Sequence, residues 1–292
     1  MSLLQEYKNS LKKIEVEEVF DLYFYRPIAF LLVKVIYHTS ITPNQLTVLS
    51  MVFGIIGALF YSYGTKHSYI LGAIFILMYN IVDCSDGQLA RLKKNGTPAG
   101  RILDGISDYV VSTATYFGIA FGHASNSSNP IMWWIITAAA GFSNALQAGL
   151  LDFYRTRYLD YVLNRVSVLD EGLESFEEEY QRLKTVRGRF FDKFVIWIYL
   201  KYSLVQQKVT SSKTNKEKER QNISAEVYAK MNRKLIHLWT LLGTTTQWTF
   251  LIVTSFLNRL DLYLLGILII WNLLAIVLYY MQSNVDSKLK LK

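Results

Sequence analysis

Long apolar runs alternate with short polar turns along most of this chain. A helix needs about 20 mostly apolar residues to cross the hydrocarbon core of a bilayer. Several stretches reach that length, and 51% of the residues are hydrophobic, which is too apolar for an ordinary soluble domain. The pattern predicts an all-α integral membrane bundle of six transmembrane helices. The predicted crossings are 44–63, 69–91, 101–122, 131–153, 236–258 and 262–281.

The segment 1–41 is predicted to form N-terminal amphipathic and interfacial helices. Glu17 and Glu18 lie among apolar side chains, a pattern typical of a helix with one solvated face. The apolar stretch 27–38 is too short to span a bilayer, so we interpret it as an interfacial helix, with a short crossing as the alternative. Pro43 then marks the start of the first crossing, because proline's missing N–H costs least at a helix start.

A long segment, 154–235, separates the fourth predicted crossing from the fifth. Its composition changes from acidic to basic, then to apolar, then to a polar run that is typical of a flexible linker. The apolar piece suits a helix on the membrane surface better than a seventh crossing. The predicted divisions are the N-terminal helices 1–41, crossings one to four in 42–153, the cytoplasmic insert 154–235, and the last two crossings with a cytoplasmic tail in 236–292.

The basic residues are distributed unevenly between the predicted turns. Of 31 lysines and arginines, only Lys66 and Arg259 fall in the turns assigned to the outside. Cytoplasmic loops carry the Lys/Arg excess of membrane proteins. Both termini, the turn 92–100 and the insert are therefore predicted to face the cytoplasm, at the plasma membrane if the source is bacterial. No nucleic acid is expected as a partner, because no aromatic and basic binding module accompanies the net charge of +8.

Four aspartates interrupt the second and third predicted crossings: Asp83, Asp86, Asp104 and Asp108. An ionised carboxylate in hydrocarbon is costly unless it is paired, hydrated or metal-bound, so such residues indicate a functional site. Spacings of three and four residues place each pair on one helix face, and the turn 92–100 makes the two helices antiparallel neighbours. Gathered carboxylates suit hard divalent cations, so we predict a site for Mg²⁺ or Mn²⁺, with two ions fitting better than one.

Small residues and one arginine accompany these aspartates. Gly87, Ala90 and Gly100 leave room for a nucleotide diphosphate to approach the backbone, and Arg91 offers a cationic fork to phosphate oxygens. Small residues also let membrane helices pack closely, and this structural interpretation stays open for Gly100.

Together these residues resemble, without a departure, the signature of the CDP-alcohol phosphotransferase (CDP-alcohol phosphatidyltransferase) family. That signature reads D, two residues, DG, two residues, AR, eight residues, G, three residues, D, three residues, D. Here it runs from Asp83 to Asp108. The six-crossing layout, the amphipathic N-terminus and the Thr42, Pro43 and Asn44 sequence are also similar to the family, whereas the insert falls outside the resemblance.

The resemblance implies roles for the matching positions. By analogy with the family, Asp83, Asp86 and Asp104 bind the metal ions, and Asp108 both ligates metal and acts as general base on the acceptor hydroxyl. The implied nucleotide contacts are Gly87, Ala90, Arg91 and Gly100. Catalysis would be a direct displacement that releases CMP without a covalent enzyme intermediate, and a homodimer is expected on the same ground.

The acceptor site is predicted from basic residues just after the fourth predicted crossing and just before the fifth. Arg155 and Arg157 lie in a stretch similar to one found in bacterial members, although Leu159 stands where an acidic residue often follows. With Arg233 and Lys234, they would surround an anionic acceptor. The alternative is that all four anchor helix ends on the cytoplasmic side.

The resulting expectation is a phospholipid-synthesising enzyme that joins CDP-diacylglycerol to a polar alcohol, such as an inositol compound or glycerol 3-phosphate. The alternative within the class is a choline or ethanolamine phosphotransferase with diacylglycerol as acceptor. Two other classes are less favoured. A cation transporter would carry its aspartates at mid-depth between repeated halves, and a non-catalytic scaffold would have lost a motif aspartate.

Overall fold

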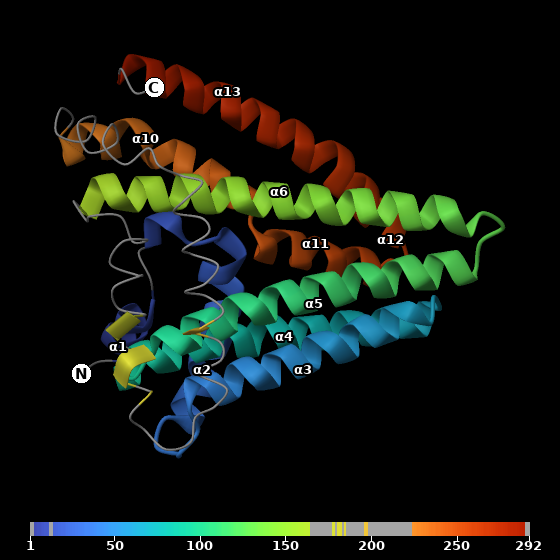
Figure 1. Ribbon diagram of the computed structural model, residues 1–292, viewed down its shortest axis with the longest axis horizontal. Coiled ribbons are helices and arrows are strands. Elements are labelled where there is room, and N and C mark those ends of the chain that lie inside the picture. The colour runs from blue at the N-terminus through green and yellow to red at the C-terminus, as the bar shows by residue number, and fades with distance from the viewer. Residues whose placement is uncertain are drawn as a thin grey trace.

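The computed structural model describes residues 3–11, 14–163, 177–178, 180–182, 184, 196–197 and 224–289. This part of the chain is helical and contains no strand, which confirms the all-α class (Figure 1). The longer helices are α1 (Leu3–Ser10), α2 (Arg26–Ile36), α3 (Pro43–Ser62), α4 (Lys66–Lys93), α5 (Pro98–Ser125), α6 (Pro130–Leu163), α10 (Ala225–Trp239), α11 (Thr244–Phe256), α12 (Leu260–Leu265) and α13 (Asn272–Lys288). Short turns of 3₁₀ or π helix are η1 (Ile14–Val16), η2 (Asp21–Tyr25), η3 (Thr240–Leu242) and η4 (Gly266–Trp271). The surface helix expected in the insert lies almost entirely outside the described residues.

Four described helices are long and apolar enough to cross a membrane, as expected of an integral membrane protein. They are Pro43–Ser62, Lys66–Lys93, Pro130–Val162 and Leu260–Lys288. They correspond to the first, second, fourth and sixth predicted crossings, and the last one runs from α12 through the π turn η4 into α13. The third predicted crossing is also one long helix, α5, of 28 residues. Its polar and small residues leave it less apolar than the other four.

The fifth predicted crossing, 236–258, differs from the expected single helix. α10 ends at Trp239, η3 follows, and α11 begins only after Gly243, which has an extended backbone. A side chain on Gly243 would overlap the carboxylate of Glu18, so the N-terminal segment packs directly against this break. The apolar pattern predicted the length of the run but not the interruption, because the interruption depends on a contact from a distant segment.

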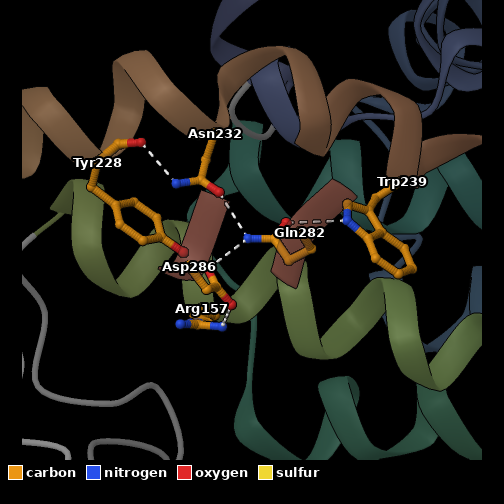
Figure 2. A network of polar contacts seen from close by, with 6 residues as sticks. All are labelled: Arg157, Tyr228, Asn232, Trp239, Gln282 and Asp286. Carbon is orange, nitrogen blue, oxygen red and sulfur yellow. Dashed lines mark hydrogen bonds and ion pairs between the residues drawn. The ribbon is translucent and has the colours of Figure 1, made fainter. Parts of the chain in front are cut away.

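Both termini lie at the end of the molecule where α4 ends and α5 begins (Figure 1). There α6, α10 and α13 are joined by a buried polar network (Figure 2). Gln282 accepts a hydrogen bond from Trp239 Nε1 at 3.3 Å and donates to Asn232 Oδ1 and to Asp286 Oδ1, both at 2.9 Å. Asp286 in turn forms an ion pair with Arg157 at 2.7 Å. Satisfied polar groups of this kind set one register between packed helices.

Helix starts frame the aspartate motif. Thr42 caps α3 and Thr97 caps α5, each with its side-chain oxygen accepting a backbone N–H, and Pro43 and Pro98 follow them. Pro43 therefore begins a helix, as predicted. α4 ends at Lys93, and the residue that follows, Lys94, has a left-handed φ of 52° that turns the chain toward α5. The two motif helices consequently run antiparallel (Figure 1), and both pack against α3.

The N-terminal segment reverses the predicted amphipathic pattern. Glu17 and Glu18 are each only 4% exposed, whereas Tyr23 is 77% exposed. Glu17 is buried in an ion pair with Arg26 at 2.8 Å, and Glu18 contacts the start of α11. The prediction of a solvated face that includes Glu17 and Glu18 is therefore wrong, because both carboxylates find polar partners inside.

Candidate functional site

Three of the four motif aspartates converge. Asp83 projects from α4, and Asp104 and Asp108 project from α5. Each offers one carboxylate oxygen, and these oxygens all lie within 4.8 Å of one another. Three carboxylates at such a distance repel one another strongly unless a cation or protons intervene. The group is therefore a candidate divalent-cation site.

The buried oxygen of Asp83 fits this interpretation. Its Oδ1 atom is buried and has no hydrogen-bond partner among the described residues. An unpaired carboxylate oxygen in a protein interior is costly, and coordination to Mg²⁺ or Mn²⁺ would compensate it. The donor set, all carboxylate oxygens, is the one that these hard cations prefer.

Asp86, the fourth motif aspartate, has a different environment. It is buried and accepts a hydrogen bond from the Thr47 hydroxyl of α3. It lies outside the group of converging carboxylate oxygens. In this structure Asp86 links α4 to α3, and its role as a metal ligand stays a prediction.

Tyr79 is a site residue that sequence reasoning missed. Its buried hydroxyl donates a hydrogen bond of 2.6 Å to Oδ1 of Asp108. It lies four residues before Asp83 on α4, so both side chains leave the same helix face. This four-residue spacing from Asp83 is the feature of the sequence from which Tyr79 could have been predicted. Tyr79 orients the Asp108 carboxylate and so determines where its second oxygen lies.

The predicted nucleotide positions Gly87 and Arg91 lie together on α4. Both terminal nitrogens of Arg91 lie 3.4 Å from the point that a Cβ atom on Gly87 would occupy, so the guanidinium covers this glycine. Ala90 faces the turn between α4 and α5, where a Cβ on Gly96 would be 3.6 Å from its methyl group. The nucleotide contacts of Gly87, Ala90 and Arg91 stay predictions.

Gly100 has a structural reason to be small. A Cβ atom there would lie 2.6 Å from Oδ1 of Asn44 at the start of α3. Its N–H also donates to Thr97 Oγ1 at 3.0 Å and completes the cap of α5. These contacts favour the packing interpretation of Gly100, and its nucleotide contact remains a prediction.

The four predicted acceptor-binding residues differ in their ion pairs, hydrogen bonds and exposure. Arg157 is paired with Asp286 (Figure 2), Arg233 lies 3.6 Å from Glu15, and Lys234 is exposed on α10. Arg155 on α6 differs from them, because its Nε atom is buried and has no hydrogen-bond partner among the described residues. Among the described residues, Arg155 is therefore the acceptor candidate whose unused hydrogen-bond donor is buried.

Buried acidic residues of the N-terminal segment were also missed from the sequence. Glu18 accepts hydrogen bonds from the N–H of Thr246 at 2.9 Å and from its hydroxyl at 3.1 Å, and thereby caps α11. Asp21 lies nearby and accepts a weak hydrogen bond from Cys84, the neighbour of Asp83, at 3.6 Å. Burial and, second to it, the neighbouring Asp21 carboxylate raise the pKa of Glu18 to about 7, against the opposing effect of Arg155.

Replacing Glu18 with glutamine is expected to change how stability depends on pH. A carboxyl with a raised pKa in the folded protein stabilises it below the unfolded pKa, and this stability is lost as the pH rises toward 7. The native protein should therefore lose up to about 3 kcal/mol between pH 4.5 and 8 that Glu18→Gln does not lose. Melting temperatures of both proteins across that range measure the difference. If melting temperature depended on pH in the same way in both proteins, the raised pKa of Glu18 would be contradicted.

Comparison with known proteins places this site in a recognised domain. Residues 40–167 match the family model described as CDP-alcohol phosphatidyltransferase. A curated relative, the "Bifunctional IPC transferase and DIPP synthase" of Rubrobacter xylanophilus, is 28% identical over 120 residues. That alignment covers 41% of this chain but only a quarter, 25%, of the relative. The matched range contains the four motif aspartates and α3 to α6. The candidate site thus lies within the part of the chain that is similar to the CDP-alcohol phosphatidyltransferase family.

Proposed function

We propose that this protein is a membrane-embedded CDP-alcohol phosphotransferase of phospholipid biosynthesis. It transfers a phosphatidyl or other phosphoalcohol group from a CDP-linked donor to an alcohol acceptor and releases CMP. The convergence of Asp83, Asp104 and Asp108 within the matched domain carries this proposal.

The reaction requires one bond to form and one to break. The acceptor oxygen attacks the β-phosphorus of the donor, and the bond between that phosphorus and the oxygen of CMP breaks. The acceptor hydroxyl proton passes to the carboxylate of Asp108, which Tyr79 holds through its hydrogen bond of 2.6 Å. Arg91 binds diphosphate oxygens beside Gly87.

Asp83, Asp86, Asp104 and Asp108 are the residues we propose as ligands for Mg²⁺ or Mn²⁺, in a site for two ions. Bound ions of this kind neutralise charge on the phosphoryl oxygens and lower the pKa of a hydroxyl that they contact. Without cations, the three converging carboxylates would repel an anionic donor.

For the substrates, we propose CDP-diacylglycerol as donor and a polar, anionic alcohol as acceptor, such as an inositol phosphate or glycerol 3-phosphate. Arg155 supports this choice, because its buried Nε has no hydrogen-bond partner among the described residues and a buried guanidinium N–H gains most from an anionic partner. Arg157, Arg233 and Lys234 remain weaker candidates for the same pocket. A choline or ethanolamine phosphotransferase is the alternative.

The proposed topology has six crossings with the active site and both termini in the cytoplasm. The two termini lie at the same end of the described structure, which agrees with an even number of crossings (Figure 1). Segment 42–153 is proposed as the catalytic part, 154–235 as a cytoplasmic insert and 236–292 as the closing crossings. A homodimer is proposed from the resemblance to the family.

The test is CMP release by purified protein in lipid, with CDP-diacylglycerol offered against a panel of polar alcohols. CDP-choline and CDP-ethanolamine with diacylglycerol form a second panel. Release with one pairing is expected to fall to background with EDTA and to return with excess Mg²⁺ or Mn²⁺, because the carboxylates need cations to accept an anionic donor. Release that is indifferent to EDTA would reject the metal site, and no release with either panel would reject the function.

A further inference from the structure

The N-terminal helix α1 contacts the motif arginine directly. Nε of Arg91 donates a hydrogen bond of 2.5 Å to the carbonyl oxygen of Ser10, the last residue of α1, which is fully buried. The terminal nitrogens of Arg91 lie over Gly87. Asp83, Gly87 and Arg91 follow one another at four-residue intervals on α4, so they share a helix face. The bond to Ser10 therefore orients the guanidinium along the face that leads to the aspartates.

Three contacts hold α1 in place. The hydroxyl of Tyr7 donates to the carbonyl oxygen of Leu22 at 3.1 Å, and its ring packs edge-on against Phe30 at 5.3 Å. At the surface, Glu6 forms an ion pair of 2.6 Å with Lys34 of α2. The position of the Ser10 carbonyl thus depends on side chains that are remote from the aspartates.

The hydrogen-bond partner of Arg91, the Ser10 carbonyl, is neutral and therefore leaves the positive charge of the guanidinium uncompensated. Arg26, a nearby arginine, is neutralised by the carboxylate of Glu17 at 2.8 Å. The hydrogen bond that Arg91 forms within the described residues ends on a carbonyl oxygen, which restrains the side chain without cancelling its charge. The terminal nitrogens form the fork that binds phosphate oxygens in pairs. An arginine held in this way is prepared for an anionic ligand.

We propose that α1 is a positioning element of the nucleotide site, and that it acts by holding Arg91 through the Ser10 carbonyl. The ligand class is the diphosphate of a cytidine nucleotide. This inference rests on the proposed function, because that function supplies the nucleotide. It adds that residues outside the matched domain determine how well the domain binds its donor.

The test variant is Tyr7→Ala in the full chain, with Tyr23→Ala as the matched control. Both changes remove a tyrosine from the N-terminal segment, but Tyr23 is exposed whereas Tyr7 holds α1. Tyr7→Ala is expected to raise the Kd for CDP in Mg²⁺ about tenfold, the scale of one hydrogen bond to a charged group. The KM for the donor should rise in parallel, with kcat and the KM for the acceptor unchanged. Tyr23→Ala should match the native protein.

A double-mutant cycle distinguishes positioning of Arg91 from a general structural role. Arg91→Lys keeps the charge but has no Nε–H to donate to Ser10. If α1 acts through Arg91, Tyr7→Ala should cost less than about twofold in the Arg91→Lys background. An equal loss in both backgrounds would overturn the inference.

Glu6→Lys gives a milder second test, should Tyr7→Ala reduce the yield of folded protein. It replaces the ion pair with repulsion from Lys34 at a partly exposed position, and about a threefold rise in the Kd for CDP is expected. Native protein that binds CDP with an affinity unaffected by Tyr7→Ala and by Glu6→Lys would overturn this inference alone. Native protein that neither binds CDP nor releases CMP would overturn the proposed function as well.

Discussion

Replacing Asp108 with asparagine is expected to lower the rate of CMP release about 1,000-fold. A positioned general base contributes roughly 10² to 10⁴ in rate, and the amide cannot accept the acceptor's proton at neutral pH. The substitution also removes one of three charges from the converging carboxylates. The change is nearly isosteric, and the amide oxygen can still accept the hydrogen bond from Tyr79. The loss should therefore appear in kcat with little change in melting temperature.

Asp261→Asn is the control for this chemistry. Asp261 is partly exposed in the first turn of α12, where it pairs with Arg259 at 2.7 Å. α12 lies away from the end of the bundle that holds the termini (Figure 1). Its replacement should leave CMP release within about twofold of native, because exposed ion pairs contribute little. If Asp108→Asn protein released CMP at the native rate, Asp108 would not be the general base, and the proposed phosphotransferase function would be weakened.

The convergence of the motif aspartates could be predicted from the sequence, because it depends on spacings within two consecutive helices and on the turn that joins them. Spacings of three and four residues on two apolar helices imply a shared face, and a turn with Pro98 and Gly100 implies that the helices reverse. The structure brings Asp83, Asp104 and Asp108 together accordingly. Tyr79 could have been found from the same periodicity, but tyrosine is common in membrane helices and carried no separate signal.

Contacts between distant segments were not predictable in the same way. The acidic residues before α2 indicated a solvated face. Glu18 instead caps α11 through Thr246, which lies 228 positions later in the chain. Arg91 is likewise oriented by Ser10, which lies 81 positions earlier. The break at Gly243 has the same origin. Hydrophobic periodicity reports which residues avoid water, and it does not report which polar partner lies beside a buried acid.

The close approach of α5 to α3 is a packing feature on which the position of Asp104 and Asp108 depends. A Cβ atom on Gly118 would overlap the carbonyl oxygen of Ala58 and lie 3.1 Å from its carbonyl carbon. One turn later, Gly122 meets the carbonyl oxygen of Tyr61 in the same way. Backbone atoms of a membrane helix cannot rotate aside as a side chain can. An added methyl group must therefore move the whole of α5, which carries Asp104 and Asp108, away from α3.

Gly118→Ala is accordingly expected to destabilise the protein by about 3 kcal/mol and to lower its melting temperature by about 10 °C, at the upper end of the usual cost of overpacking. Release of CMP should fall as well, because Asp104 and Asp108 shift relative to Asp83. Gly149→Ala on α6 is the matched control, since no atom of the described residues lies within 4 Å of its added methyl group. Alanine is intrinsically better than glycine in a helix by about 1 kcal/mol. The control should therefore melt at or above the native temperature, and equal losses in the two variants would show that close packing of α3 against α5 is not what requires glycine at position 118.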